Sequence, residues 1–267
     1  MPVSLFQRIS PTHVTLTVIT MNNKAKAGGK PLVYLSAAIS AMGGMLFGYD
    51  IGVISGAILF IKKDFSFSQG MEEIVVSSVL LGSLVGAAVG GFLADRIGRR
   101  RLLIITAAVF GVGAIGAALA PGTAWLLAAR IVAGGAIGIA SFVAPLYISE
   151  IGPVDIRGKL VSINQVALTS GIVISYLIDY AFAGSQAWRW MFAMAVIPAA
   201  AFGVGLIFIP NSPRWLVSRG HVDQARAVLN RIRPGIRWRA NSAIFSLARR
   251  RRRVTGPNCS VRCCDRQ

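Results

Sequence analysis

Metal ligands and acidic residues are scarce in this sequence. Its 267 residues include two histidines, His13 and His221, and three cysteines that all lie near the C-terminal end, Cys259, Cys263 and Cys264. Zinc sites need several such ligands at short, defined spacings, so the sequence predicts no metal site. It also contains no motif for a bound cofactor, and we expect no enzymatic activity.

Charge of either sign is also sparse, which excludes an ordinary soluble domain. Only 14% of the residues are charged, 54% are hydrophobic, and the mean hydropathy is +0.63. These values are typical of a polytopic membrane protein. The net charge of +18 does not indicate a nucleic-acid partner, because nine arginines and one acid lie from Arg237 onward and much of the remaining basic charge lies in short loops.

Six apolar segments are long enough to cross a bilayer as helices, which takes about 20 residues each. The predicted spans are 32–61, 72–94, 102–120, 124–149, 159–183 and 189–209. The first is longer than required and is expected to tilt or to project beyond the bilayer. The expected fold class is therefore an all-α polytopic membrane protein with six transmembrane helices.

Basic residues collect in alternate connections between these spans. One side of the membrane would carry Lys24, Lys26, Lys30, Arg96, Arg99, Arg100, Arg101, Arg157 and Lys159. The other side would carry only Lys62, Lys63 and, at a helix boundary, Arg189. The positive-inside rule then predicts that both termini are cytoplasmic in a multi-pass protein of the cell (inner) membrane.

The chain divides into four segments. Residues 1–30 form a cytoplasmic N-terminal segment, in which Met21 and the following NNKAKAGGK resemble a natural start, so the residues before Met21 are expected to be an over-called extension. Residues 31–209 form the six-helix bundle, and residues 210–234 begin a short cytoplasmic helical segment. Residues 235–267 are rich in arginine and cysteine without an amphipathic period, which predicts an irregular tail, disordered or frame-shifted.

Glycines recur every four residues along three of the spans. They are Gly44, Gly48, Gly52 and Gly56 in the first, Gly82, Gly86 and Gly90 in the second, and Gly134 and Gly138 in the fourth. Each set forms a ridge of small residues where two helices can approach closely in lipid, so packing is the favoured interpretation. Asp50 lies about 200° around the helix from Gly48 and is expected to point away from the ridge, towards a cavity.

A polar stripe follows the fifth span. Residues spaced by three or four positions share one face there: Ser162, Gln165, Thr169, Ile172, Tyr176 and Asp179. Such a stripe on an apolar helix faces either a water-filled path or hydrogen-bonding groups of neighbouring helices, and both interpretations stay open. Asp179 lies near the outer end of the span and is expected to be solvated.

Two charges lie deep inside the predicted spans. Arg130 lies about 9 Å and Asp50 about 17 Å from the outer ends of their helices, and the reach of the arginine could close that gap. An ion pair would lower the cost of burying both charges. An acid at membrane depth is a candidate functional residue in its own right.

Four motifs, in sequence order, carry a resemblance to a known family. FGYDIGVISG resembles the first-helix signature of sugar/proton symporters, and GFLADRIGRR matches G-x-x-x-D-R-x-G-R-R, the loop signature of the major facilitator superfamily. The segment from Ala129 to Gln165 resembles the fourth helix, its loop and the start of the fifth. PNSPRWLVSRGHVDQARAVLNRIR is similar to the start of the family's cytoplasmic helical domain. Over about residues 31–233 the chain resembles the sugar porters, which implies the N-terminal half of the major facilitator fold.

The resemblance also implies roles for individual residues. Asp50 would be the proton-titrating acid and Arg130 the partner that tunes its proton affinity, which favours proton symport. The sugar-binding residues would be Gln165, Phe47, Ile172 and Thr169. The motif and gate on the cytoplasmic side would comprise Gly91, Asp95, Arg96, Gly98, Arg99, Arg100, Glu150, Arg157 and Arg214. The implied partners are a monosaccharide, protons and the lipid bilayer.

The sequence departs from the family in three respects. Asn211 stands where the family has the acid of its P-E-S-P-R pattern, the similarity ends at about Pro234, and no second six-helix half follows. Because alternating access needs two bundles, transport would require self-association or a separate second half. The alternatives are a non-transporting membrane sensor or regulator, or an inactive gene fragment.

Overall fold

The computed structural model of the chain describes residues 30–153 and 156–232. Within these ranges all regular secondary structure is helical. The predictions for Met21, for most of the N-terminal segment and for the tail from residue 235 lie outside the described residues.

Five long helices and one divided span form the bundle. They are α1 (Lys30–Phe65), α2 (Gln69–Ile97), α3 (Arg99–Ala118), α4 (Thr123–Ile151), α5 (Arg157–Ala183), and the pair α6 (Trp188–Ala193) and α7 (Val196–Phe208). All six segments are long and apolar enough to cross a membrane, which confirms the six predicted spans. α1 overruns its prediction at both ends.

The sixth span is interrupted, although the sequence analysis treated it as one segment. α6 ends at Ala193 and α7 begins at Val196. Pro198 lies in the first turn of α7, where it has no N–H to donate and its ring would collide with the carbonyl group of Met194 in a continuous helix. A proline is tolerated in the first turn of a helix, so the chain ends one helix and begins another.

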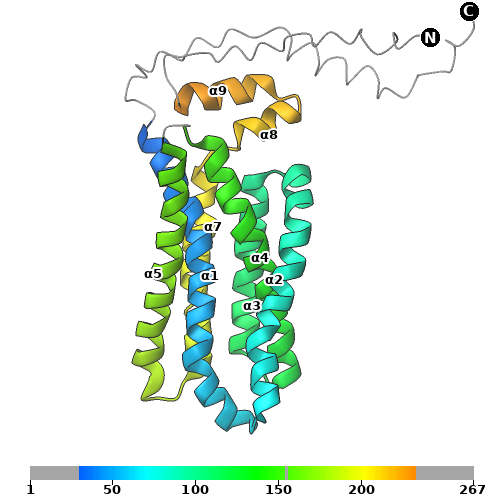
Figure 1. Cartoon of the computed structure of the whole chain (residues 1–267), viewed down its shortest axis with the longest axis vertical. Coiled ribbons are helices and arrows are strands. Elements are labelled where there is room, and N and C mark those ends of the chain that lie inside the picture. The colour runs from blue at the N-terminus through cyan, green and yellow to red at the C-terminus, as the bar shows by residue number, and fades with distance from the viewer. Residues whose placement is uncertain (1–29, 154–155, 233–267) are drawn as a thin grey trace, which may run out of the picture.

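Two short helices, α8 (Pro213–Ser218) and α9 (Val222–Ile232), lie across one end of the bundle. Figure 1 shows them above the ends of the long helices. We call this the cap end, and we call the end with the turn between α1 and α2 the turn end. α9 buries Ala225 and Ile232 and exposes most of its other residues.

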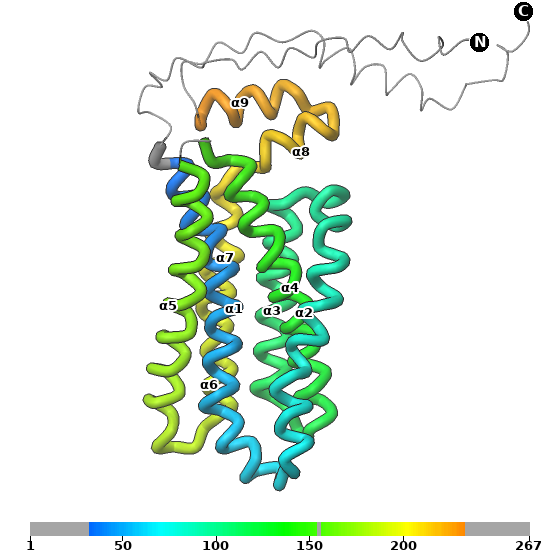
Figure 2. Tube along the Cα trace, in the orientation of Figure 1, coloured from blue at the N-terminus to red at the C-terminus, as the bar shows by residue number. Residues whose placement is uncertain are grey.

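The helices pack as two close pairs. α1 packs along α5, α2 packs along α4, and α3 lies between α4 and α7, as the tube in Figure 2 shows. The glycine ridges form both pair contacts: a Cβ on Gly48 would overlap the carbonyl oxygen of Leu168, and a Cβ on Gly86 would overlap that of Gly135. The prediction that the glycines serve helix packing is therefore confirmed for these ridges.

Candidate functional site

A buried ion pair joins the two helix pairs in the middle of the bundle. Asp50 on α1 and Arg130 on α4 are 5% and 2% exposed, and Oδ2 of Asp50 lies 3.6 Å from a terminal nitrogen of Arg130. Asp50 points away from the α1 glycine ridge, which faces α5, and towards α4. The pairing inferred from helix depth is present, although Asp50 is enclosed and does not line an open cavity.

This ion pair leaves part of its hydrogen-bonding capacity unused. Nε of Arg130 donates to the carbonyl oxygen of Val75 at 3.1 Å, and the guanidinium carbon lies 5.8 Å from the ring centre of Phe192. Oδ2 of Asp50 and Nη1 of Arg130 have no hydrogen-bond partner among the described residues. Buried charges are stable when ion pairing and hydrogen bonds together satisfy them. At a separation of 3.6 Å and with these atoms unpartnered, the pair is only partly satisfied by the described residues.

Tyr49 fixes the helix that carries Asp50. Its hydroxyl donates to the carbonyl oxygen of Met191 at 2.7 Å, and its side chain is fully buried. Met191 belongs to α6, so this bond sets the rotation of α1 against the sixth span. The sequence analysis did not identify Tyr49 as a residue of the site. The one indication in the sequence was that a tyrosine hydroxyl directly precedes the intramembrane acid Asp50.

The four predicted sugar-binding residues lie on α1 and α5 with different exposures. Gln165 and Thr169 are exposed on α5, and the Thr169 hydroxyl donates to its own helix, at 3.1 Å to Gln165 O and 3.0 Å to Val166 O. Ile172 is half-buried, with its backbone against Gly48 and Gly52. Phe47 is half-buried and packs against the core. The polar face of α5 is therefore exposed over most of its length, at Gln165, Thr169 and Tyr176, and Ile172 is half-buried.

Asp179 ends this face and is buried, so the expectation that it is solvated was wrong. Its exposed fraction is 7%, and a Cβ on Gly56 would lie 2.5 Å from its Cγ. The absence of a side chain at Gly56 leaves a notch in α1 that the carboxyl group fills. The prediction considered depth alone, whereas the facing residue on α1 decides the exposure.

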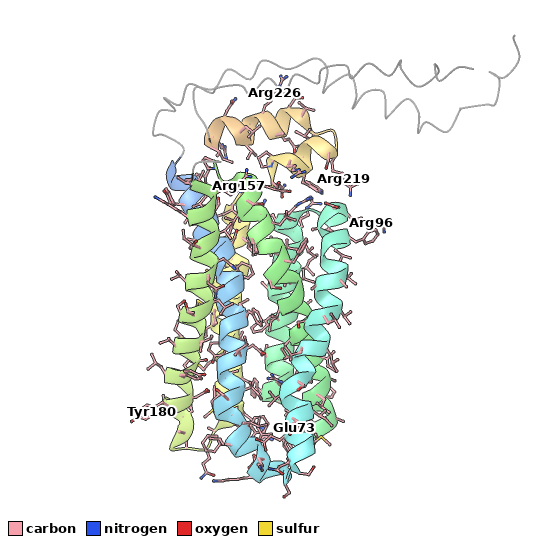
Figure 3. The ribbon with its side chains drawn as sticks, in the orientation of Figure 1. Glu73, Arg96, Arg157, Tyr180, Arg219 and Arg226 are labelled. Atoms are coloured by element: carbon pink, nitrogen blue, oxygen red, sulfur yellow. The ribbon has the colours of Figure 1, made fainter. Side chains whose placement is uncertain are left out.

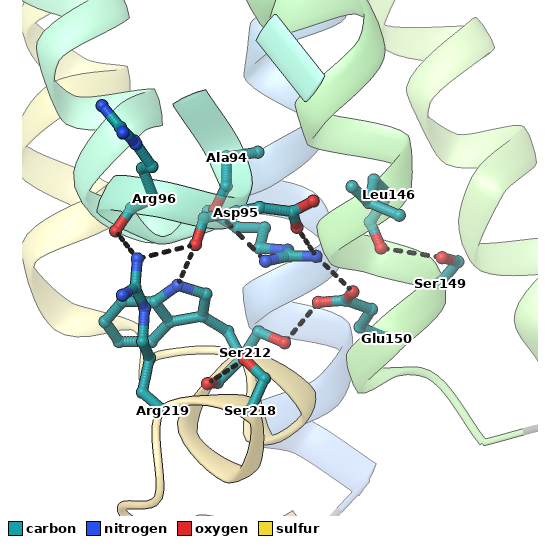
Figure 4. A network of polar contacts seen from close by, with 11 residues as sticks. Ala94, Asp95, Arg96, Leu146, Ser149, Glu150, Ser212, Ser218 and Arg219 are labelled. Carbon is teal, nitrogen blue, oxygen red and sulfur yellow. Dashed lines mark hydrogen bonds and ion pairs between the residues drawn. The ribbon is translucent and has the colours of Figure 1, made fainter. Parts of the chain in front are cut away.

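An ion-pair network lies at the cap end (Figure 4). One terminal nitrogen of Arg99 lies 2.9 Å from Oδ1 of Asp95 and 3.2 Å from Oε1 of Glu150. The Ser212 hydroxyl donates to the other oxygen of Glu150. Ser212 directly follows Asn211, the position where the family acid is missing, so a hydroxyl beside that position contacts the network.

The α8 segment clamps the α2–α3 turn through backbone carbonyl groups. Nε1 of Trp215 and a guanidinium nitrogen of Arg219 each donate to the carbonyl oxygen of Asp95 at 3.1 Å. Arg219 also donates to the carbonyl oxygen of Arg96 at 2.5 Å. Gly98 has a φ of 96°, which glycine adopts readily, and an ideal Cβ there would lie 3.0 Å from the Trp215 ring. Sequence reasoning missed Trp215 and Arg219.

Four of the five predicted gate arginines lie outside the ion-pair network: Arg96, Arg100, Arg157 and Arg214, which lines the cleft beside the network. The guanidinium carbon of Arg96 lies 4.7 Å from the ring centre of Phe92, and Arg157 forms no ion pair within the described residues. Figure 3 labels both arginines at the cap end, with Glu73 and Tyr180 towards the turn end. Arg100 binds α7 by donating to two carbonyl oxygens near its end, those of Leu206 at 2.8 Å and Ile207 at 2.5 Å.

A cleft of about 530 Å³ opens beside the network. Its lining combines charged and apolar groups from α2, α3, α4 and α8: Gly91, Asp95, Arg99, Phe142, Leu146, Glu150, Arg214, Trp215 and Ser218. Five of the predicted motif and gate residues are thus brought together here. Such a mixed lining can receive a polypeptide segment that offers both charge and apolar side chains.

Comparisons with known proteins identify the family of this chain. A sequence profile described as "Sugar (and other) transporter" matches residues 36–244. A D-xylose transporter of Levilactobacillus brevis is 48% identical over 191 residues, which cover 71% of this chain and 42% of the relative. A galactose-proton symporter of Escherichia coli is 41% identical over 210 residues, covering 79% of this chain and 45% of the relative.

The fold is also found among solved structures. The proton:xylose symporter XylE bound to 6-bromo-6-deoxy-D-glucose matches with a TM-score of 0.73 and 32% identity, over 83% of this chain and 52% of that chain. This chain therefore spans about half the length of these relatives, and its bundle matches the N-terminal half of the fold. The family profile covers most of the sequence, so the chain belongs to the sugar (and other) transporter family, the sugar porters of the major facilitator superfamily.

Proposed function

We propose that this chain is the proton-coupling half of a monosaccharide symporter. The observation that supports this most directly is the buried pair of Asp50 and Arg130, whose charges are enclosed at membrane depth with hydrogen-bonding atoms left free. Acids at this depth are costly and are retained for ion or proton pathways. The relatives include a galactose-proton symporter and a proton:xylose symporter, which supports proton coupling rather than passive transport.

The proton acts through the strength of this ion pair. Ionised Asp50 attracts Arg130 and holds α1 against α4. A proton on Asp50 removes that attraction, and the Arg130 guanidinium keeps its bond to Val75 O with more freedom to move. Because interactions that differ between two states set their populations, protonation at Asp50 favours one arrangement of α1 over another.

The sugar binds along the open face of α5. Gln165 supplies donors and an acceptor, and Thr169 supplies a hydroxyl, which suits a ligand rich in hydroxyl groups. Phe47 and Ile172 add apolar contact for the faces of a sugar ring. Both Gln165 and Thr169 are exposed in this half, so a second six-helix bundle, or a second copy of this chain, would complete the site.

The cap end faces the cytoplasm, and the termini lie on that side of the cell (inner) membrane. This orientation rests on basic loop residues, among them Arg96, Arg101 and Arg157, that lie at the cap end. The network of Asp95, Arg99 and Glu150 would close this end, with Arg214 on the cleft wall. Arg96 and Arg157 remain available for ion pairs with the other half.

Uptake into proteoliposomes tests this function. The chain is reconstituted, and uptake of labelled D-xylose, D-galactose and D-glucose is measured with and without an inward proton gradient. If two copies of the chain complete the site, we expect gradient-driven uptake of at least one sugar, lost in Asp50→Asn. Glu73→Gln is the matched control, because it removes an exposed acid of α2 that forms no ion pair among the described residues, and it should leave uptake unchanged.

Equilibrium binding of the same sugars separates the remaining outcomes. pH-dependent binding without uptake would restrict the chain to a binding half that needs a partner bundle. Uptake that ignores both the proton gradient and Asp50→Asn contradicts the coupling role. The absence of both uptake and binding contradicts the proposal as a whole.

A further inference from the structure

Asp179 is a second buried acid, and the coupling pair does not involve it. It lies on α5, is 7% exposed, and neither carboxyl oxygen has a hydrogen-bond partner among the described residues. The carboxyl group sits in the notch at Gly56, where an ideal Cβ would lie 2.5 Å from both its Cγ and its Oδ2. The backbone of Gly56 approaches it without the geometry of a hydrogen bond.

The charged groups on neighbouring helices are already engaged elsewhere. On α4, Arg130 pairs with Asp50 and donates to Val75 O. On α6, Arg189 lies 3.8 Å from Asp64 and donates to the carbonyl oxygen of Ala120 at 3.3 Å. No ion pair reaches Asp179 within the part of the chain that the structure describes.

The titratable groups that face Asp179 from α1 carry no positive charge. The Tyr49 hydroxyl is already committed to Met191 O and carries no positive charge. Asp50 lies six residues before Gly56, or about 9 Å along the helix axis. An ionised Asp179 would thus have no cation as a partner among the described residues.

A buried carboxyl group without a counter-ion is far less costly as the neutral acid than as the carboxylate. The ionised form loses its hydration and gains neither ion pair nor hydrogen bonds in exchange. Such groups take up a proton instead of remaining charged. The contact between α1 and α5 at Gly56 therefore fits the neutral acid.

We propose that Asp179 is a second proton-binding residue of this half, which holds a proton while α1 and α5 are packed together at Gly56. It lies on the turn-end side of Asp50. The step is the transfer of one proton from a hydronium ion of the aqueous phase to the carboxylate, which gives the neutral acid and a water molecule, and no other group of the protein changes. This inference goes beyond the proposed coupling pair and does not depend on sugar transport, since it concerns the state of one carboxyl group.

Infrared absorption of protonated carboxyl groups tests the proposal directly. The full chain in lipid nanodiscs at neutral pH is compared with Asp179→Asn, which keeps the size of the side chain. We expect a carboxylic-acid carbonyl band in the wild type that is lost in Asp179→Asn. Asp50→Asn is the matched control: it makes the same chemical change at an acid that has a counter-ion, and it should retain the band.

Isotope labelling keeps the test decisive if a variant folds poorly. Aspartate labelled with ¹³C at the carboxyl group should shift the band in the wild type, and the shifted band should persist in Asp50→Asn. The proposal is overturned if the wild type shows no such band at neutral pH, if labelling leaves it in place, or if Asp50→Asn abolishes it. None of these readouts measures uptake, so a failure here is distinct from a failure of the proposed symport.

Discussion

The α1–α5 and α2–α4 pairs use the same packing device and differ in what their glycines meet. In α2–α4, Gly82 and Gly86 of α2 lie against the carbonyl oxygens of Ile131 and Gly135, which are backbone atoms. In α1–α5, Gly52 lies against the Ser175 hydroxyl and Gly56 against the Asp179 carboxyl group. These two α2–α4 contacts are therefore made by backbone atoms alone, whereas the α1–α5 contact also buries polar side chains.

This difference shows how one helix pair can hold a rigid frame while the other carries chemistry. Backbone contacts leave nothing to rearrange, because no rotamer can relieve them. Side-chain contacts at Ser175 and Asp179 can change with rotamer or protonation. The ion pair of Asp50 and Arg130 links a helix of the polar pair to a helix of the rigid pair, so it is the point where the two meet.

Breaking the ion pair of Asp50 and Arg130 should have the largest effect on the free energy of unfolding. Arg130→Met leaves Asp50 buried without its counter-charge, and removing one partner of a buried ion pair costs about 3–5 kcal/mol. The free energy of unfolding of the chain in detergent, measured by denaturant titration, should fall by that amount. The double variant Asp50→Asn/Arg130→Met should recover most of the loss. Equal stability of the single and double variants would show that the pair is not the link.

Adding one methyl group at a glycine of each helix pair should distinguish the α1–α5 contact from the α2–α4 contact. Gly86→Ala and Gly52→Ala should each lower the free energy of unfolding by about 2 kcal/mol, because overpacking forces neighbours to move. Ser175→Ala should restore about 1 kcal/mol to Gly52→Ala, since it removes the overlapping hydroxyl. No side-chain change can restore Gly86→Ala, whose obstacle is backbone.

Gly111→Ala serves as the control for this comparison. No atom lies within 4 Å of a Cβ added there, so the substitution should be neutral or slightly stabilising through helix propensity. If Ser175→Ala rescued Gly86→Ala as well as Gly52→Ala, the distinction between the pairs would be lost. Double-variant cycles in the same detergent measure all of these terms.

The smallest effect is expected at the α8 clamp, which lies outside both helix pairs. Trp215→Phe removes the indole N–H that donates to Asp95 O and leaves a smaller aromatic ring at this position, so it should cost about 1 kcal/mol. Hydrogen exchange should speed up in α8 and the α2–α3 turn, with the α1–α5 contact unaffected. Faster exchange spread evenly over the bundle would contradict a local clamp.

Much of the fold could be predicted, because a bilayer imposes length and hydropathy on every span. The six spans agree with the helices to within a few residues, and the glycine ridges identified the packing surfaces. The division of the sixth span was missed, although Pro198 was visible in the sequence. Hydropathy records whether a segment crosses the membrane and not whether its hydrogen bonds are continuous.

Two signals placed site residues: the cost of burying charge, and the family motif whose Asp95, Arg99 and Glu150 meet at the cap end. Asp50 and Arg130 are conspicuous because charges at membrane depth need partners. The burial of Asp179 depends on the glycine that faces it from α1, which the sequence of α5 alone does not reveal. Trp215 and Arg219 bind backbone carbonyl groups, and backbone acceptors carry no residue-specific pattern.

Arg100 ties together the two shortest spans, and this bears on the lipid the bundle fits. α3 has 20 residues and the α6–α7 span 21, each about 30 Å long, while α1 with 36 residues is about 54 Å long. Because Arg100 in the first turn of α3 donates to carbonyl groups in the last turn of α7, the start of α3 and the end of α7 lie at the same depth. In a thicker bilayer, hydrophobic mismatch would therefore occur first at α3 and the α6–α7 span, while α1 would still extend beyond the hydrocarbon core.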